Sequence, residues 1–290
     1  MNSHRCLLAA LTLGGVCLAA RATTDRVAHE SFPFDLAGRR ITVWCHVPSG
    51  ATAQSPVVVV MHGVGRNGED YLNDWMPHAE THRFVLVVPE FSKKEFPGVE
   101  CYNYGNTVDK AGRPLPRAQW SFSALEPIFD AVKVRTGNRS ARYRLFGHSA
   151  GAQFVQRFIY FVPAARVERV VAANAGWYVL PDFSTAFPYG LKNTAVTEAD
   201  LRQALALPMT VLIGTADTDP VLHALRHTPE ADAQGPDRLA RGKFFFARAE
   251  EAARGRQIRL GWHWATAPNV DHSDQRMAPF AVKLLLPDPP

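Results

Sequence analysis

Short continuous apolar runs recur along the chain, and stretches with apolar residues at helical spacing lie between them. Runs of this kind, rich in β-branched residues, predict strands buried on both faces of a parallel sheet. Strands are expected at 56–62, 84–89, 141–146, 167–173, 208–213 and 258–265, with an alternating, antiparallel strand near a sheet edge at 40–47. Helices are expected at 123–135, 152–160, 238–254 and 278–286. This alternation predicts an α/β fold with a mostly parallel sheet and helices on both faces.

The longest stretch without a regular pattern lies at residues 177–207. It is too long for a plain connection and rich in aromatic and turn residues, so we expect a short lid-like insertion. Trp177 and Tyr178 are our candidates for substrate binding, and Phe183 and Phe187 could line the same pocket. A packed core within the lid is the alternative that the pattern leaves open.

Composition and charge are those of a soluble globular protein. Of 290 residues, 47% are hydrophobic and 20% charged, with a net charge of +5. No long run of Lys or Arg occurs, so the sequence gives no support for a nucleic-acid partner. Lys192, Arg202 and Arg226 could meet an anionic substrate, although a solvated surface is the favoured interpretation.

The N-terminus has the pattern of an export signal. A short basic start precedes a Leu/Ala-rich run at 6–20, which is short for a membrane span, and Ala20-Arg21-Ala22 matches a cleavage site. We expect residues 1–22 to be removed, leaving a single domain at 23–290 in a secreted or periplasmic protein that is not bound to a membrane. A retained membrane anchor is the alternative.

Two cysteines remain after that cleavage, Cys45 on an expected strand and Cys101 in a loop. An oxidising compartment favours a disulfide between them, and two separate thiols are the alternative.

The pentapeptide Gly147-His148-Ser149-Ala150-Gly151 lies between an expected strand and an expected helix. Glycines on both sides allow the sharp turn that exposes a serine hydroxyl above the sheet. A serine nucleophile needs an imidazole to take its proton and a carboxylate to orient the imidazole, and in this architecture the chain order is Ser, Asp, His. The pentapeptide alone is weak evidence for a serine nucleophile. The assignment depends on whether an aspartate and a histidine follow it in this order.

Both partners follow, each after a later strand. Asp217 and Asp219 come after the strand at 208–213, and the motif position favours Asp217. His272 follows the strand at 258–265; its rival His263 alternates within that strand. The loop after the strand at 56–62 is expected to supply the amide of Val64 to an oxyanion hole, opposite the amide of Ala150 at a helix N-terminus.

Histidine pairs at helical spacing, His78 with His82 and His223 with His227, could bind zinc, but neither has the intervening glutamate of the H-E-x-x-H type. We therefore expect no metal and no other cofactor.

Four blocks, 61–65 (MHGVG), 147–151 (GHSAG), 214–217 (GTAD) and 268–272 (PNVDH), resemble the motifs of exported α/β-hydrolases related to polyhydroxyalkanoate depolymerases and to feruloyl and acetylxylan esterases. The resemblance extends from about residue 37 onward. It implies an α/β-hydrolase fold and a serine esterase that acts on a carboxylic ester, often within a polymer. Position by position, it implies Ser149 as nucleophile, Asp217 as acid and His272 as base.

Two departures from that family limit the inference about substrate. Depolymerases of this type usually have a small residue or a cysteine where this chain has Val64, and they often carry a separate polymer-binding domain. Some relatives hydrolyse amide-linked acidic polymers such as poly(aspartic acid), so an amidase is an alternative function. A binding protein that has lost catalysis is a third, and it would require a broken Ser-His-Asp set.

Overall fold

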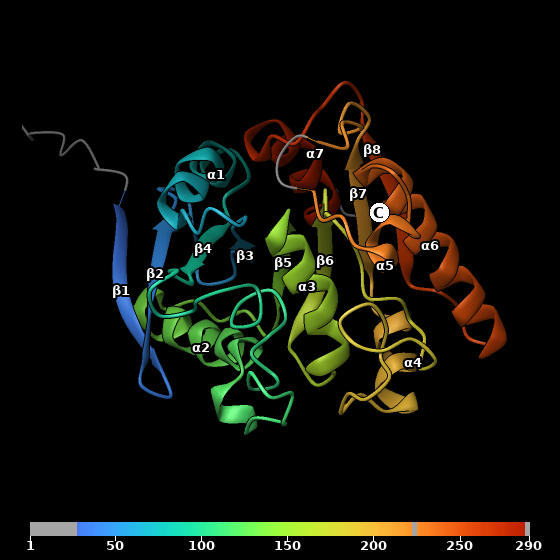
Figure 1. The fold of residues 1–290 in the computed structure, drawn as a ribbon. Helices are drawn as coiled ribbons and strands as arrows, with labels where there is room; N and C mark the ends of the chain where they lie inside the picture. Colours follow the sequence, from blue (N-terminus) through green and yellow to red (C-terminus); the bar gives the residue numbers. More distant parts are fainter. Residues whose placement is uncertain (1–27, 222–224, 288–290) are drawn as a thin grey trace, which may run out of the picture.

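The computed structural model describes residues 28–221 and 225–287, which form an eight-stranded sheet between two layers of helices (Figure 1). The strand order is β1-β2-β4-β3-β5-β6-β7-β8, antiparallel at β1/β2 and β2/β4 and parallel elsewhere. The strands are β1 Ala28–Leu36, β2 Arg39–Val47, β3 Val57–Met61, β4 Val85–Glu90, β5 Tyr143–His148, β6 Val167–Ala173, β7 Met209–Gly214 and β8 Trp262–Ala267.

Helices cover both faces of this sheet, as the sequence predicts. They are α1 Gly68–His82, α2 Leu125–Thr136, α3 Ala150–Phe161, α4 Glu198–Ala206, α5 Pro229–Asp232, α6 Arg238–Gly255 and α7 Asp274–Leu285, with 3₁₀ turns at Arg117–Gln119 and Ser121–Ala124. Helices α1 and α7 pack on one face, and α2, α3, α4 and α6 pack on the other.

The central strands divide their side chains between two cores. In β3, Val57 and Val59 face the α2/α3 side, while Val58 and Val60 face the α1/α7 side, and all are buried. Successive residues of a strand point to opposite faces, so a strand covered on both sides needs an unbroken apolar run. The expected α/β-hydrolase architecture is confirmed.

Four of the helices and strands were not anticipated: β1, α1, α4 and the short α5. The strand expected near a sheet edge at 40–47 is β2, which is antiparallel to both of its neighbours and lies next to the edge strand β1. Strand β1 pairs with β2 through a tight turn in which Ala37 and Gly38 have φ of 50° and 83°. Positive φ at both turn residues matches the twist of a two-residue hairpin. Pro33 in β1 and Pro77 in α1 obscured the periodicity, because proline usually interrupts both kinds of element.

The stretch at 177–207 is a packed connection to β7 and contains α4. Most of its buried residues, among them Leu201 and Leu205, belong to the same core as α3, while Trp177 and Tyr189 pack in a small separate cluster with Ala231. Thr197 and Asp200 form a capping box at the start of the helix. None of the stretch lines the cavity at Ser149 described below. The stretch that we expected to form a lid-like insertion therefore packs against the core and does not cover the cavity at Ser149.

Cys45 and Cys101 are free thiols, so the expected disulfide is wrong. Cys45 is buried on β2 near Glu30 and Arg135, and burial raises the pKa of its thiol to about 12. Cys101 lies in the loop after β4, where its charged neighbour is Arg66. The raised pKa keeps the Cys45 thiol protonated, and the charged neighbours of Cys45 differ from those of Cys101. Cys45 is therefore not poised to form a disulfide with Cys101.

The expected signal peptide, residues 1–22, lies outside the described residues. Within the described part of the chain, no helix has the length and apolar character needed to cross a membrane.

Candidate active site

The turn from β5 into α3 has the backbone geometry that exposes a serine hydroxyl. Ser149 has φ 56° and ψ −114°, a positive φ that is costly for a residue with a Cβ. The turn is tight as well: a Cβ at Gly147 would lie 2.2 Å from Gly151 O, and a Cβ at Gly151 would lie 2.1 Å from Met61 O. Glycine is required at both positions, and the turn places Ser149 at the carboxyl end of β5.

Side chains from three loops form a continuous hydrogen-bonded chain at this edge of the sheet. His272 Nε2 lies 2.9 Å from Ser149 Oγ, and His272 Nδ1 lies 2.7 Å from Asp217 Oδ2. A carboxylate only accepts, so the imidazole proton is on Nδ1 and Nε2 accepts from the serine hydroxyl. The His272 and Asp217 side chains are 7% and 3% exposed, so water competes little for these bonds. The structure thus brings together the three residues that the motifs single out.

Asn174, at the end of β6, ties two of these loops together. Its Nδ2 donates to Asp271 O at 3.0 Å, and its Oδ1 accepts from the Gly214 amide at 2.8 Å. It is fully buried and has φ 53°, a conformation that asparagine tolerates better than most residues. The sequence analysis missed it because it lies in no motif; its one signal is an asparagine directly after a buried apolar strand.

The two carboxylates after β7 have different surroundings. Asp219 Oδ1 accepts from the Val221 amide at 2.7 Å, as a turn residue does. Asp217 is buried, and while its Oδ2 meets His272, its Oδ1 accepts from Nη1 of Arg238 at 3.3 Å. Asp217, which the motif favours, is therefore the carboxylate that is hydrogen-bonded to His272. Arg238 is a second partner of Asp217 that the sequence analysis did not identify.

The loop after β3 is held in place by a buried, neutral histidine. His62 Nε2 accepts from the Phe91 amide at 3.0 Å, so Nδ1 carries the proton and donates to Gly63 O, also at 3.0 Å. Burial lowers the pKa of His62 to about 3, which keeps the ring uncharged. Val64, two residues after His62, is 55% exposed and lines the same cavity as Ser149.

Val64 and Ala150 occupy the positions expected for amides that bind an oxyanion. Ala150 is the first residue of α3, and amides of a first turn have no acceptor within their own helix. The Val64 amide belongs to the loop after β3, where Val64 is exposed and lines the same cavity as Ser149. Their role as oxyanion donors stays a prediction.

Known proteins with the same architecture are close in sequence. Poly(aspartic acid) hydrolase-1 from Sphingomonas sp. KT-1 is 43% identical over 89% of this chain and 98% of that chain, with a TM-score of 0.87. LpqC, a poly(3-hydroxybutyrate) depolymerase from Bordetella parapertussis, is 37% identical over 89% of this chain and 90% of that chain, with a TM-score of 0.85. The chain belongs to the family of α/β-hydrolases that contains these two enzymes.

Other known proteins are less similar to this chain, in sequence identity or in the share of the chain that matches. Poly(3-hydroxyalkanoate) depolymerase C from Paucimonas lemoignei is 29% identical over 131 residues, which is 45% of this chain but only 29% of that protein. An S-formylglutathione hydrolase from Agrobacterium tumefaciens, 17% identical with a TM-score of 0.56, shares the fold. No family model matches the chain.

The hydrolase has an open cavity of about 400 Å³ beside Ser149. It is lined by Gly63, Val64, Gly65, Asn67, Tyr71, Asp74, His148, Ser149, His272 and Asp274. None of these is Lys or Arg. Burial raises the pKa of Asp274 well above its usual value and, more modestly, that of Asp74, so the acidic wall is less charged than its two carboxyl groups suggest.

A tyrosine of α1 supports the serine turn from the side of this cavity. The Tyr71 hydroxyl lies 2.8 Å from His148 Nδ1, and the His148 ring centroid lies 4.8 Å from that of His272. Burial holds the pKa of Tyr71 well above its ordinary value, so the hydroxyl stays protonated. The pair connects α1, the serine turn and the imidazole, and no sequence motif of the hydrolase indicated it.

Trp177 and Tyr178, expected at the substrate, do not line this cavity. Tyr178 is fully buried and stacks on Phe245 with ring centroids 4.3 Å apart, so its assignment is corrected to core packing. Trp177 is 3% exposed and lies against the guanidinium groups of Arg157 and Arg226, with 4.3 Å and 5.2 Å between each Cζ and the ring centroid. Both side chains face inward because the segment packs into the core.

The histidines considered as alternatives lie elsewhere. His263 is exposed on β8, and His227 is close to Asp232, with 2.9 Å between Nδ1 and Oδ1. His223 lies outside the described residues. Within residues 28–221 and 225–287, no group of three or more His, Cys, Asp or Glu side chains is arranged to hold a metal ion.

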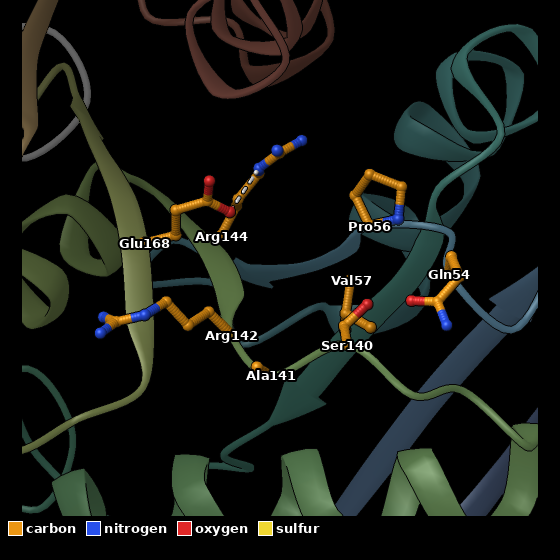
Figure 2. Close-up of a pocket in the computed structure, with 8 residues that line it drawn as sticks. All are labelled: Gln54, Pro56, Val57, Ser140, Ala141, Arg142, Arg144 and Glu168. Atoms are coloured by element: carbon orange, nitrogen blue, oxygen red, sulfur yellow. Dashed lines mark hydrogen bonds and ion pairs between the residues drawn. The ribbon is translucent and has the colours of Figure 1, made fainter.

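A second hollow, of about 300 Å³, lies at the opposite edge of the sheet (Figure 2). Val57, Ser140 and Arg142 line it near the amino ends of β3 and β5, and Arg144 pairs with Glu168 at 3.2 Å. The predicted site residues follow the carboxyl ends of the strands, where parallel sheets form their sites. This hollow is therefore remote from Ser149.

Replacing Gly151 with alanine is expected to disturb the site through the backbone. The new Cβ would lie 2.1 Å from Met61 O, so the loop after β3 must move or the helix must shift. Such overpacking costs about 2 kcal/mol of unfolding free energy, and we expect a lower Tm and slower reaction of Ser149 with a fluorophosphonate. Gly255→Ala on α6, with nothing within 4 Å of the new Cβ, is the control and should leave both unchanged. Equal behaviour of the two variants would contradict this account.

Proposed function

We propose that the protein is a secreted serine hydrolase that cleaves carboxylic esters derived from polymers or oligomers, with Ser149, His272 and Asp217 as its catalytic triad. The observation that carries the proposal is the unbroken hydrogen-bonded chain from Ser149 Oγ to Asp217 Oδ2. It supplies a nucleophile, a base in hydrogen-bond contact with it, and a group that orients the base.

The proposed reaction follows from that chain. Ser149 Oγ attacks the ester carbonyl carbon while His272 Nε2 takes its proton, and the carbonyl oxygen becomes an oxyanion facing the Val64 and Ala150 amides. The imidazolium then gives its proton to the leaving alkoxide as the C–O bond breaks. Water attacks the acyl-enzyme by the same steps, which releases the acid and restores the serine. Asp217 stabilises the imidazolium that forms in each half.

The cavity beside Ser149 favours an uncharged acyl or alcohol group. No cation lines it, and its carboxyl groups would repel an anion when ionised. The 37% identical poly(3-hydroxybutyrate) depolymerase supports an ester of this kind, because its polymer carries no charge along the backbone.

An amidase that acts on an anionic polymer such as poly(aspartic acid) is the second candidate. The 43% identity to poly(aspartic acid) hydrolase-1 favours it, as do two cations near Trp177. Arg157 is fully buried, and no carboxylate of the described residues forms an ion pair with it or with Arg226. Burial lowers the pKa of Arg157 only to about 9, so it remains charged at neutral pH.

Substitutions in the triad test the mechanism. We expect Ser149→Ala to lose activity on p-nitrophenyl butyrate by about 10⁵-fold or more, and Asp217→Asn by about 10⁴-fold because the imidazole loses its orienting acceptor. Asp219→Asn, a matched change two residues away, should retain most of the rate. A fluorophosphonate should label Ser149 in the wild type. A folded wild type that is neither labelled nor active would leave a binding protein as the better description.

A substrate panel separates ester from amide cleavage. We expect short-chain esters and poly(3-hydroxybutyrate) oligomers to be hydrolysed, with rates that change little with salt. If poly(aspartic acid) is instead the preferred substrate and its rate falls as salt rises, the charge attraction of the amidase proposal is supported. Feruloyl esters are included because the sequence motifs also resemble those of feruloyl esterases. Arg226→Gln should then lower the rate on the polyanion and leave p-nitrophenyl butyrate unaffected.

Export is proposed from the N-terminal pattern, with cleavage after Ala22. The mass of the protein recovered from outside the cytoplasm should correspond to a chain that begins at Thr23. Recovery of the full-length chain in the membrane fraction would instead support the retained anchor.

A further inference from the structure

Arg238 places a buried positive charge on the far side of Asp217 from His272. It is the first residue of α6 and is 2% exposed, and its Nη1 donates to Asp217 Oδ1 at 3.3 Å. The other carboxylate oxygen accepts from His272 at 2.7 Å. Asp217 therefore lies between a permanent cation and an imidazole whose charge changes during the proposed reaction.

The two partners of Asp217 compete for its negative charge. When His272 is neutral, the negative charge of a carboxylate that is 3% exposed is stabilised by a nearby cation, and Arg238 provides one. When His272 is protonated, the imidazolium gains from Asp217 but is repelled by Arg238. A guanidinium in this place thus favours the neutral imidazole, which is the form that accepts the proton of Ser149.

We propose that Arg238 is a positioning residue that pairs with the second carboxylate oxygen of Asp217 and holds His272 in its neutral, proton-accepting form down to a lower pH. The inference rests on the triad proposed above. It extends that triad by a fourth member, which acts through Asp217 and does not touch the substrate.

Other ionisable groups face the same site and must stay unchanged in the test. They are Tyr71 and Asp74 on α1, His148 at the end of β5, Tyr178 after β6, and Asp271, Asp274 and Arg276 next to His272 in sequence. Tyr71 and Tyr178 have raised pKa values, so they are neutral in the acidic range. The charge of Arg238 lowers the pKa of Tyr178, so its loss raises that pKa further and leaves Tyr178 neutral in the acidic range.

The same helix offers a matched control. Arg241, three residues along α6, is also buried, but its guanidinium donates to Gly176 O at 2.7 Å and to Gly235 O at 2.8 Å. It also pairs with Asp232 at 2.8 Å, a residue that is half exposed and outside the triad. Because these partners do not include Asp217, loss of Arg241 should destabilise the fold while the ion pair of Asp217 with Arg238 stays in place.

The test is the pH profile of kcat/KM on p-nitrophenyl butyrate, whose acidic limb reports the pKa of the free enzyme's base. In Arg238→Gln, Asp217 is no longer neutralised and stabilises the imidazolium more strongly. We expect the midpoint of the acidic limb to rise by about one pH unit. Arg238→Met, which fills the volume without charge, should shift it similarly, and Arg238→Lys should shift it less. Arg241→Gln should lower Tm and leave the midpoint unchanged.

The outcomes separate this inference from the proposed function. An unshifted acidic limb in folded Arg238→Gln or Arg238→Met, with wild-type activity intact, overturns the role of Arg238 and leaves the triad standing. An equal shift in Arg241→Gln also overturns it, since the effect would then be a general consequence of destabilisation. A wild type without activity or fluorophosphonate labelling overturns the triad itself. If Arg238→Gln does not fold, the Arg238→Met profile decides.

Discussion

The parallel register of β5, β6, β7 and β8 is the constraint on which the site depends. Gly147 pairs with Ala172 across β5 and β6, and Gly214 pairs with Ala267 across β7 and β8, so these strands end at one edge of the sheet. The loops that follow them start side by side, although Ser149 and His272 are 123 residues apart in sequence. Asn174 then fixes the spacing between two of those loops with hydrogen bonds in both directions.

Buried carboxyl groups near His272 show how the same side chain takes different forms within one site. Asp217 has a guanidinium on one oxygen and an imidazole on the other, so its charge is compensated on both sides. Asp274 accepts one hydrogen bond from Trp75 at 3.3 Å, and burial raises its pKa well above the ordinary value. The site thus has one buried acid paired with a cation and an imidazole, and a second in the cavity wall whose burial favours the protonated form.

Two regions of the molecule differ in charge. The cavity at Ser149 is lined by Asp74 and Asp274 and by no cation, whereas Arg157 of α3 and Arg226 lie against Trp177, outside that lining. Two members of the family act, by their names, on a polyester in one case and a polyamide in the other. The hydrogen-bonded Ser149, His272 and Asp217 are common to both proposals for this chain, so the side-chain charges around them distinguish an ester substrate from an anionic amide.

The sequence by itself determined the α/β architecture and the positions of Ser149, Asp217 and His272, because an apolar strand and a motif at its end are local features. It could not find Arg238 or Asn174, whose contacts join segments far apart in the chain. It also assigned Tyr178 to the substrate and Cys45 to a disulfide, since an aromatic residue or a thiol looks the same in sequence whether it faces a pocket or a core. Only tertiary packing decides which neighbours a side chain has, and those neighbours set its charge and role.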